Sequence, residues 1–218
     1  NEGVHSGGAS GHVPSSFRIA RKLLSLVEDE NTGDILVDEL HTEIPEHRLK
    51  EAETLVSILG DEVVQEFPWK NDMKPSTNDK VEGVLRRTWR PALSIVGSDG
   101  LPPTANAGNV LRPYTTLQLS MRIPPMVDAK KARDAIKKKL TESIPYEASV
   151  KLHFEEAADG WNAPETRPWL IKAIEKASEN YFDEKPCSIS EGGTIPFMAM
   201  LGERFPNAQF VITGVLGP

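Results

Sequence analysis

The sequence predicts an α+β fold: a ferredoxin-like four-stranded antiparallel sheet with helices on one face, followed by a partial α/β segment. Residues 115–123 and 148–154 alternate between apolar and polar side chains, as strands with one covered face do. Up to residue 154 the expected order is strand, helix, strand, strand, helix, strand, which is two split βαβ units. Residues 208–214 are almost wholly apolar, which is typical of a strand buried on both faces.

The first unit is expected to begin with a short strand at residues 2–5 and a helix that runs to about Glu30. Ser15 or Ser16 can cap this helix, because a serine oxygen accepts hydrogen bonds from backbone N–H groups of the first turn. The apolar residues at helical spacing are Phe17, Ala20, Leu23, Leu24 and Val27. The turn at residues 31–33, Asn-Thr-Gly, is expected to end the helix.

A long insertion follows this helix. Residues 45–59 predict a second helix, and Gly60 is its expected end. Residues 61–91 are rich in proline, aspartate and tryptophan, and no regular structure is predicted for them. Residues 92–96 then predict the strand that completes the first unit.

The second unit is expected to contain two strands around a helix from Asp128, its cap, to about Ser143. The predicted apolar strand faces are Leu117, Leu119, Met121 and Ile123 in the first strand, and Val150, Leu152 and Phe154 in the second. Beyond this unit the sequence predicts helices at 169–181 and 194–204 and strands at 187–190 and 208–214. We therefore expect two domains, 1–158 and 159–218, of which the second is incomplete.

Composition limits the classes of function. The 218 residues carry a net charge of −7, which disfavours a nucleic-acid surface unless the basic residues cluster. The single cysteine, Cys187, excludes an internal disulfide and fits a reducing compartment such as the cytoplasm. No apolar run approaches the roughly 20 residues of a membrane helix, and no signal peptide is recognised. Because the chain lacks an initial methionine and ends on a strand, we interpret it as a fragment of a larger protein.

The opening stretch GVHSGGASGHVPSSF, residues 3–17, combines glycines, serines and two histidines. It lacks the lysine of a phosphate-binding loop and the Gly-x-Gly-x-x-Gly spacing of a dinucleotide site. His5 and His12 have no neighbouring ligand pattern for a metal. The remaining interpretation is a backbone device: Gly7, Gly8 and Gly11 let the chain leave the strand through unusual dihedrals. This device would hold His5 on the open face of the sheet.

Four segments carry a resemblance to a known family: EGVHSGGASGHVPSSFRIARKLLSLVEDENTGDIL, RPALSIVG, NVLRPYTTLQLSMRIPP and SEGGTIPFMAMLGERFPNAQFVITGVLGP. In this order they resemble M20-type metallopeptidases of the carnosinase and cytosolic dipeptidase branch. The resemblance implies a lid, or dimerisation, domain inserted into a catalytic domain that binds two zinc or other divalent ions. It also implies a homodimer formed through the lid and a dipeptide or similar small amide as substrate.

The resemblance also implies that this chain lacks the metal machinery. The family's His-x-Asp, Glu-Glu and aspartate ligand blocks precede the lid, and its last metal histidine would follow Pro218. We interpret Glu155 and Glu156 as solvated charges at a strand exit. The chain is therefore expected to be the lid plus a returning part of the catalytic domain, to bind no metal and to be inactive alone.

Site residues follow from the same resemblance. His5 matches a histidine that stabilises the tetrahedral intermediate in the neighbouring subunit, and Asn109 stands where the family often has a threonine. Arg122 matches an arginine whose planar guanidinium can bind a substrate carboxylate at two points; the alternative is a surface arginine in an ion pair. Thr194 and Gly193 are expected at a helix N-terminus, where backbone N–H groups bind anions, although Thr194 can also be only a cap.

The expected sheet order, 4-1-3-2, places His5 and Arg122 at opposite ends of neighbouring strands. A strand of eight residues spans roughly 26 Å, so both residues cannot hold one dipeptide within a single chain. We therefore expect a dimer in which one subunit supplies Arg122 and Thr194 and its partner supplies His5 and Asn109.

Two other classes of function remain open. The first is a non-catalytic ferredoxin-like module that dimerises and binds a small ligand; the SEGGTIPF stretch and the partial α/β segment would be superfluous in such a protein. The second is nucleic-acid binding through the basic residues of 130–139. Their spacing is that of the solvated face of an amphipathic helix.

Overall fold

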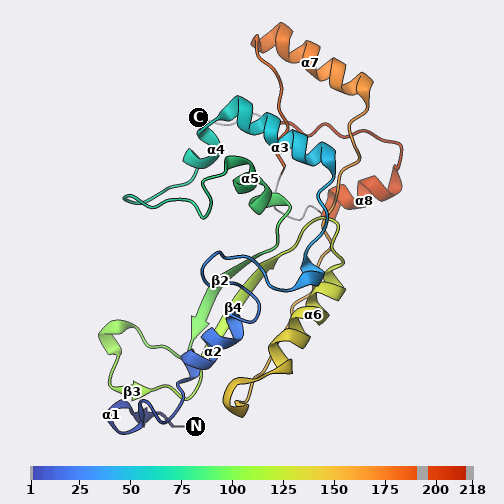
Figure 1. Cartoon of the computed structure of the whole chain (residues 1–218). Helices are drawn as coiled ribbons and strands as arrows, with labels where there is room; N and C mark the ends of the chain where they lie inside the picture. Colours follow the sequence, from blue (N-terminus) through green and yellow to red (C-terminus); the bar gives the residue numbers. More distant parts are fainter. Residues whose placement is uncertain (1, 191–195, 215–218) are drawn as a thin grey trace. The chain divides into compact units, whose positions relative to one another are not determined.

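The computed structural model describes residues 2–190 and 196–214. It has a mixed α/β architecture with small antiparallel sheets (Figure 1). The chain divides into two compact units, which we describe separately: unit 1 comprises residues 1–41 and 90–157, and unit 2 comprises residues 42–89 and 158–218. The domains predicted from the sequence pattern, 1–158 and 159–218, have different bounds from these units and remain a prediction.

Unit 1 contains all the strands of the described residues. Strand β1 (Val4–His5) pairs antiparallel with β3 (Val110–Leu111), and β2 (Ala92–Asp99) pairs antiparallel with β4 (Thr116–Arg122). The register of the second pair shifts between Ile95 and Gly97, which is a β-bulge.

The predicted four-stranded sheet is not confirmed, because the described strands form two separate two-stranded sheets. The predicted pairing of the first strand with 115–123 is wrong: β1 pairs with β3, a two-residue strand too short to show alternation in the sequence. Residues 148–154 form no ladder with other described residues, yet their side chains alternate between half-buried and exposed. The spacing of apolar residues determines which side chains face the core. A ladder also requires hydrogen bonds to the edge of a neighbouring strand, which this segment does not make within the described part of the chain.

The first predicted helix is shorter than expected. Helix α2 (Ser16–Leu24) is capped by Ser15, whose hydroxyl accepts the Arg18 N–H at 3.2 Å. After it the chain reverses at Gly33, which has a φ of 74°, and forms a bridge between Glu28 and Ile35. This reversal places Val27 in the core although the residue is no longer helical.

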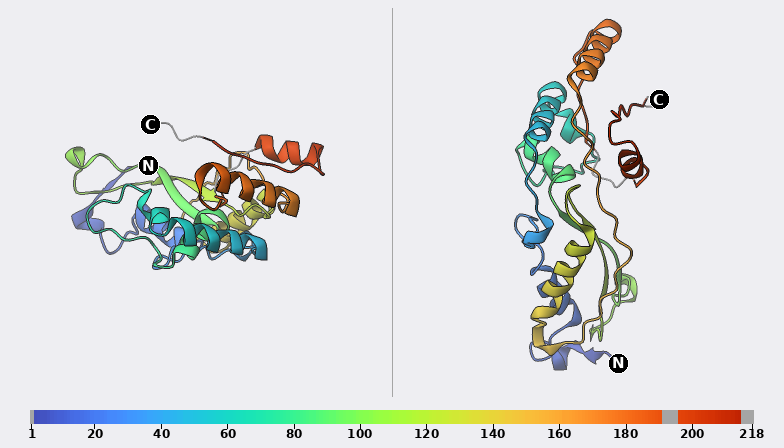
Figure 2. Two further views of the ribbon diagram at one scale, coloured as in Figure 1. Left: turned by 90° about the horizontal axis from the view of Figure 1, so that it is seen from above. Right: turned by 90° about the vertical axis from the view of Figure 1, so that its right-hand side faces the viewer.

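The other helices of unit 1 are short except for α6. They are α1 (Ser6–Ala9), α6 (Ala129–Glu142) and the 3₁₀ turns η1 (Asp38–Leu40), η2 (Thr104–Asn106) and η3 (Pro145–Glu147). Asp128 caps α6 as predicted, accepting the Lys131 N–H at 2.8 Å. Figure 2 shows α2 and α6 on one side of the β2–β4 ribbon.

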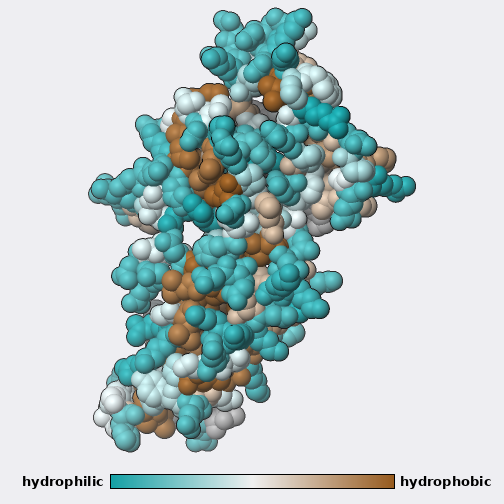
Figure 3. Space-filling view, turned by 45° about the vertical axis from the view of Figure 1, so that its right-hand side comes forward, coloured by the Kyte–Doolittle hydropathy of each residue, from teal (hydrophilic) through white to brown (hydrophobic). Residues whose placement is uncertain are grey.

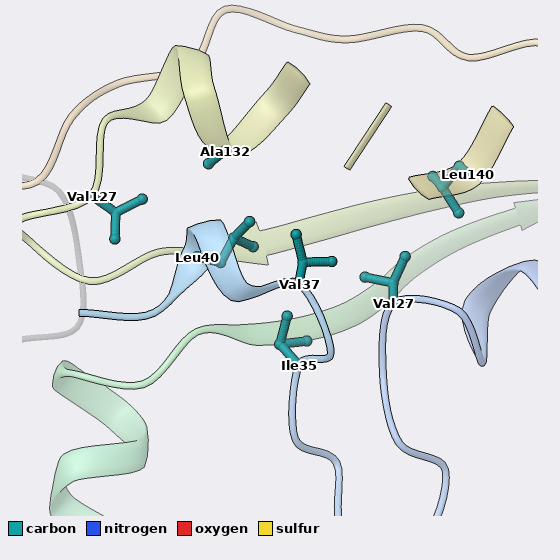
Figure 4. Packing of buried hydrophobic residues seen from close by; sticks show 7 residues of the cluster. All are labelled: Val27, Ile35, Val37, Leu40, Val127, Ala132 and Leu140. Carbon is teal, nitrogen blue, oxygen red and sulfur yellow. The ribbon is translucent and has the colours of Figure 1, made fainter. Parts of the chain in front are cut away.

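One apolar cluster forms the core of unit 1 (Figure 4). Its buried members are Val27, Ile35, Val37, Leu40, Val127, Ala132 and Leu140. Leu93 of β2, Met121 of β4 and Leu152 pack against this cluster. Leu152, which belongs to the predicted fourth strand, therefore contributes to the core of unit 1 although that segment forms no ladder with the strands that the structure describes.

Unit 2 contains helices in a region where none were predicted. Helix α3 (Glu46–Leu59) was expected, but α4 (Glu62–Gln65) and α5 (Lys80–Thr88) were not. Asp79 caps α5 by accepting two backbone N–H groups, those of Val81 and Glu82. The spacing of Val81, Val84, Leu85 and Thr88 is helical. However, the proline and aspartate residues around this segment are typical of loops, and no helix was therefore predicted.

The core of unit 2 joins α3, α4 and α5. Its buried residues are Ala52, Leu55, Val63, Val84, Leu85 and Trp89. The half-buried Cys187 packs against them.

The last part of unit 2 is helical where helices were expected, in α7 (Pro168–Phe182) and α8 (Pro196–Arg204). The predicted strands at 187–190 and 208–214 are not strands in the structure. A parallel strand forms only when neighbouring strands satisfy its backbone groups, and the described part of unit 2 supplies no strand. Among the described residues, no helix is long and apolar enough to cross a membrane.

Candidate functional site

His5 lies where β1 ends and α1 begins. Its backbone is held in register by β3, with Val4 opposite Leu111 and His5 opposite Val110. The side chain is exposed, and its Nδ1 accepts the Gly7 N–H at 3.1 Å. His5 is thereby the N-cap of α1, and its imidazole has a defined orientation although it is at the surface.

The structure brings Asn109 beside His5. The Ser6 N–H donates to the Asn109 carbonyl at 2.9 Å, immediately before the β1–β3 pairing. Asn109 is exposed, like His5. Two predicted site residues that are distant in the sequence therefore share one edge of unit 1, at the end where Figure 1 shows β1, α1 and β3 together.

Of the three glycines that were expected to adopt unusual dihedrals, Gly11 does so and Gly7 and Gly8 do not. Gly11 has a φ of 91°, which few other residues adopt, but Gly7 and Gly8 are helical residues of α1. A Cβ on Gly3 would lie 2.4 Å from Val110 Cγ1 and 3.0 Å from the Leu111 carbonyl oxygen. Gly3 is therefore needed for the close approach of β1 to β3, a requirement that the sequence did not reveal.

Arg122 lies in the other sheet, at the end of β4 that pairs with Ala92. Figure 1 shows β1 and β3 toward the opposite end of the β2–β4 ribbon, and a strand of this length spans roughly 20 Å. The Arg122 side chain is exposed and forms no hydrogen bond or ion pair with the residues that the structure describes. Unit 1 therefore does not bring Arg122 and His5 together.

Two predicted site residues, Gly193 and Thr194, lie outside the described residues. Glu155 and Glu156 are both exposed. Within residues 2–190 and 196–214, no group of three or more histidine, cysteine, aspartate or glutamate side chains could hold a metal ion. The described residues therefore do not fit a metal centre.

Shifted pKa values occur at residues other than the predicted site residues, among them Glu28, Asp29 and Cys187. Burial raises the pKa of Glu28 and that of the Cys187 thiol. The N–H groups of Thr32 and Asn31 lower the pKa of Asp29 by hydrogen bonding to its carboxylate. These shifts belong to a turn and to a core edge, so they do not identify an acid or base of a reaction.

Unit 2 contains a cavity of about 270 Å³. Val63, Phe67, Trp69 and Val84 contribute apolar walls, and cationic side chains lie at its rim. Those cations are paired: Lys80 with Asp61 at 2.6 Å, and Arg87 with Glu66. The charges of Lys80 and Arg87 are therefore already neutralised by carboxylates and are not free to bind an anionic ligand.

Exposed apolar side chains are numerous. The face in Figure 3 shows several apolar patches between polar side chains. In unit 1 the exposed apolar residues include Ile95, Val96 and Leu119 of the β2–β4 sheet, and in unit 2 they include Trp169, Tyr181 and Phe182 of α7. Helix α7 has no buried residue at all.

Three solved structures have a similar fold. Human carnosine dipeptidase 1 is 19% identical, with a TM-score of 0.66 over 93% of this chain and 43% of its own. The dipeptidase Dug1p from Saccharomyces cerevisiae is 21% identical, with a TM-score of 0.64 over 94% of this chain and 43% of its own. The M20 family metallo-carboxypeptidase Sso-CP2 from Sulfolobus solfataricus is 17% identical, with a TM-score of 0.69 over 96% of this chain and 46% of its own.

A curated relative is the cysteinylglycine-S-conjugate dipeptidase of Corynebacterium striatum. It is 23% identical over 129 residues, which are 59% of this chain and 28% of that protein. The chain thus spans less than half the length of these relatives. The sequence model of the family described as "Peptidase dimerisation domain" matches residues 1–148, more than half of the chain. The chain therefore belongs to the M20 peptidase family and contains its dimerisation domain.

Proposed function

We propose that this chain is the lid, with a returning part of the catalytic domain, of a metal-dependent dipeptidase or related aminoacyl hydrolase. The observation that carries the proposal is an exposed imidazole, His5, held in one orientation at a strand end beside Asn109. The family membership and the dipeptidase names of several relatives support a hydrolase. On this proposal the chain supplies substrate contacts and does not carry out hydrolysis alone.

His5 is the proposed oxyanion donor. Attack on an amide carbonyl places negative charge on its oxygen, and a fixed N–H donor stabilises that charge more in the transition state than in the substrate. A ring that must rotate into place would lose part of this advantage. The bond from Gly7 to Nδ1 holds the ring, and Nε2 remains to face the substrate.

Arg122 is proposed to bind the substrate carboxylate, with Thr194 and Gly193 adding an anion site in the same subunit. The distance along β4 between Arg122 and the β1 end of unit 1 supports a division of the site between two chains. One subunit of a homodimer would supply these three residues, and its partner would supply His5 and Asn109. A substrate carboxylate and the scissile carbonyl would then be held from opposite sides.

Two divalent metal ions, zinc in the terms of the family resemblance, are proposed to belong to the longer parent protein. On the family resemblance, their ligands would come from ligand blocks in other parts of the parent. When bound, such ions polarise the amide carbonyl and activate water. We also propose a cytoplasmic location, where the Cys187 thiol would stay reduced.

The lid is proposed to extend over residues 1–158 and to complete its four-stranded sheet with residues 148–154. The half-buried and exposed alternation of that segment supports this assignment, as does the packing of Leu152 against the core of unit 1. Residues 159–218 would belong to the catalytic domain. The exposed apolar side chains of α7 support a surface that the rest of that domain covers.

The proposal is tested by replacing His5 in the full-length parent with asparagine, using His12→Asn as the matched control. Asparagine can still accept the Gly7 N–H but has no donor at the position of Nε2. We expect His5→Asn to lower kcat for dipeptide hydrolysis by about 10²–10³-fold and His12→Asn to leave it unchanged. Wild-type turnover in His5→Asn, with the parent active, would refute the role of His5.

A further inference from the structure

We infer that the Gly7 backbone fixes His5 in the neutral tautomer that carries its proton on Nε2, which makes Gly7 a positioning residue for the donor. The inference rests on the proposed function for its catalytic meaning, but the tautomer itself is a property of this chain. It follows from one hydrogen bond, one close contact and one neighbouring glycine that lacks that contact.

The direction of the hydrogen bond determines the tautomer. A backbone N–H can only donate, so the Nδ1 that lies 3.1 Å from the Gly7 nitrogen must accept, and a ring nitrogen accepts only when it carries no proton. The proton of the neutral ring is therefore on Nε2. The imidazolium form carries protons on both nitrogens and would lose this bond.

The remaining nitrogen is available to a ligand. Among the described residues, the His5 ring makes one hydrogen bond, the one from Gly7 to Nδ1, and Nε2 makes none. His5 is also exposed. The Nε2–H group is therefore available as a donor to a ligand. An oxyanion is the acceptor that gains most from such a donor.

Gly7 also leaves the space in which the ring sits. A Cβ at this position would lie 3.1 Å from His5 Cε1 and 3.2 Å from Nδ1, which is closer than ordinary van der Waals contact. Because the ring is exposed, it can swing away from an added methyl group at the expense of the Gly7 bond. The predicted effect of Gly7→Ala is therefore a displaced ring in a folded chain.

Gly8 provides a matched control. It is the next residue of the same helix, α1, and a Cβ on it would meet no atom within 4 Å. Both substitutions have the same effect on backbone entropy and helix propensity. A difference between Gly7→Ala and Gly8→Ala therefore reports the contact with the His5 ring.

The first experiment reads the tautomer without activity. In the 218-residue chain labelled with ¹⁵N-histidine, long-range ¹H–¹⁵N correlation is recorded at a pH at which the His5 ring is neutral. We expect wild type and Gly8→Ala to show a protonated Nε2 and an unprotonated Nδ1, and Gly7→Ala to shift toward the tautomer mixture of free histidine. A free-histidine mixture in wild type, or equal shifts in both variants, would overturn the inference.

A second measurement guards against misfolding of Gly7→Ala. In wild type the Gly7 amide proton should resonate downfield because of its bond to Nδ1, and His5→Ala should move it upfield while leaving Gly8 in place. An unchanged Gly7 amide in His5→Ala would show that the bond is absent in solution and would also overturn the inference.

The third arm separates this inference from the proposed function. In the full-length parent we expect Gly7→Ala to lower kcat about tenfold with little change in KM, and Gly8→Ala to retain wild-type kcat. If the wild-type tautomer is fixed but His5→Asn keeps full activity, the inference stands and the oxyanion role is refuted. If the wild-type tautomer is mixed but His5→Asn has low activity, the inference is overturned and the oxyanion role stands.

Discussion

At the scale of single residues, His5 shows how an exposed side chain acquires a defined orientation. Burial usually orders a ring through packing, but His5 is exposed and is held instead by a backbone N–H two residues ahead. The strand before it is anchored by β3 and the helix after it is capped by the ring itself. A surface donor with these restraints loses little conformational freedom when a substrate binds.

The second residue of interest is Asp29, which organises the turn between α2 and the core. Its Oδ1 accepts the N–H groups of Asn31 and Thr32 at 2.8 and 2.9 Å. These bonds favour the carboxylate and hold the pKa of Asp29 below its ordinary value of 3.8. Because the folded-state pKa is lowered, the stabilising effect is fully present above the unfolded-state pKa and is lost as the pH falls through the folded-state pKa.

We predict that the amide resonances of Asn31 and Thr32 titrate together with a midpoint below 3.8, the ordinary carboxyl value. An NMR pH titration of the chain measures this midpoint. The Asp29→Asn variant is the control, since it lacks the titrating group and should abolish the transition at both amides. A midpoint at or above the ordinary value would contradict the assignment of these bonds.

At the scale of elements, residues 35–40 connect the turn to the core of unit 1. Leu40 is fully buried, whereas Leu36 in the same segment is 45% exposed. Removing buried methyl groups loses both the transfer free energy and the packing around the cavity. The two leucines therefore separate the effect of burial from the effect of residue type.

We predict that Leu40→Ala lowers the free energy of unfolding by about 2–5 kcal/mol and that Leu36→Ala changes it by about 0.5 kcal/mol or less. Denaturant titration of the 218-residue chain, followed by circular dichroism, measures both. Equal losses in the two variants would show that Leu40 does not pack as Figure 4 depicts.

The sequence predicted elements best where one local signal was sufficient. Helix α6 has a cap at Asp128 and regular apolar spacing, and its bounds agree with the prediction to within about a residue. Helix α5 carries equally local signals, in Asp79 and its apolar spacing, but the loop-like composition around it concealed them. Strand β3 was missed because two residues cannot show a period.

The predictions that failed depend on partners. Residues 208–214 have the composition of a buried strand, but a ladder needs a neighbouring strand that the described part of unit 2 does not provide. For the site, the sequence placed His5 at the end of β1 correctly, but the neighbourhood of Asn109 depends on the β1–β3 pairing. The contact of Gly7 with the ring also depends on three-dimensional geometry, and no sequence pattern reports it.

At the scale of the whole molecule, the described residues form two cores, one in each unit. The candidate residues are divided as well: His5 and Asn109 share one end of unit 1, and Arg122 is at the other end of β4. Relatives that share this fold are more than twice as long. A division of labour between two copies of the full-length protein is therefore the central claim of the proposed function.

Mixing two inactive full-length variants, His5→Ala and Arg122→Ala, tests this claim most directly. If each site combines Arg122 of one subunit with His5 of its partner, a heterodimer contains one intact site and one doubly altered site. After random subunit exchange of an equimolar mixture, we predict recovery of about a quarter of wild-type activity. Activity that stays at the level of the separate variants, with heterodimers demonstrated by mass spectrometry, would contradict a site shared between subunits.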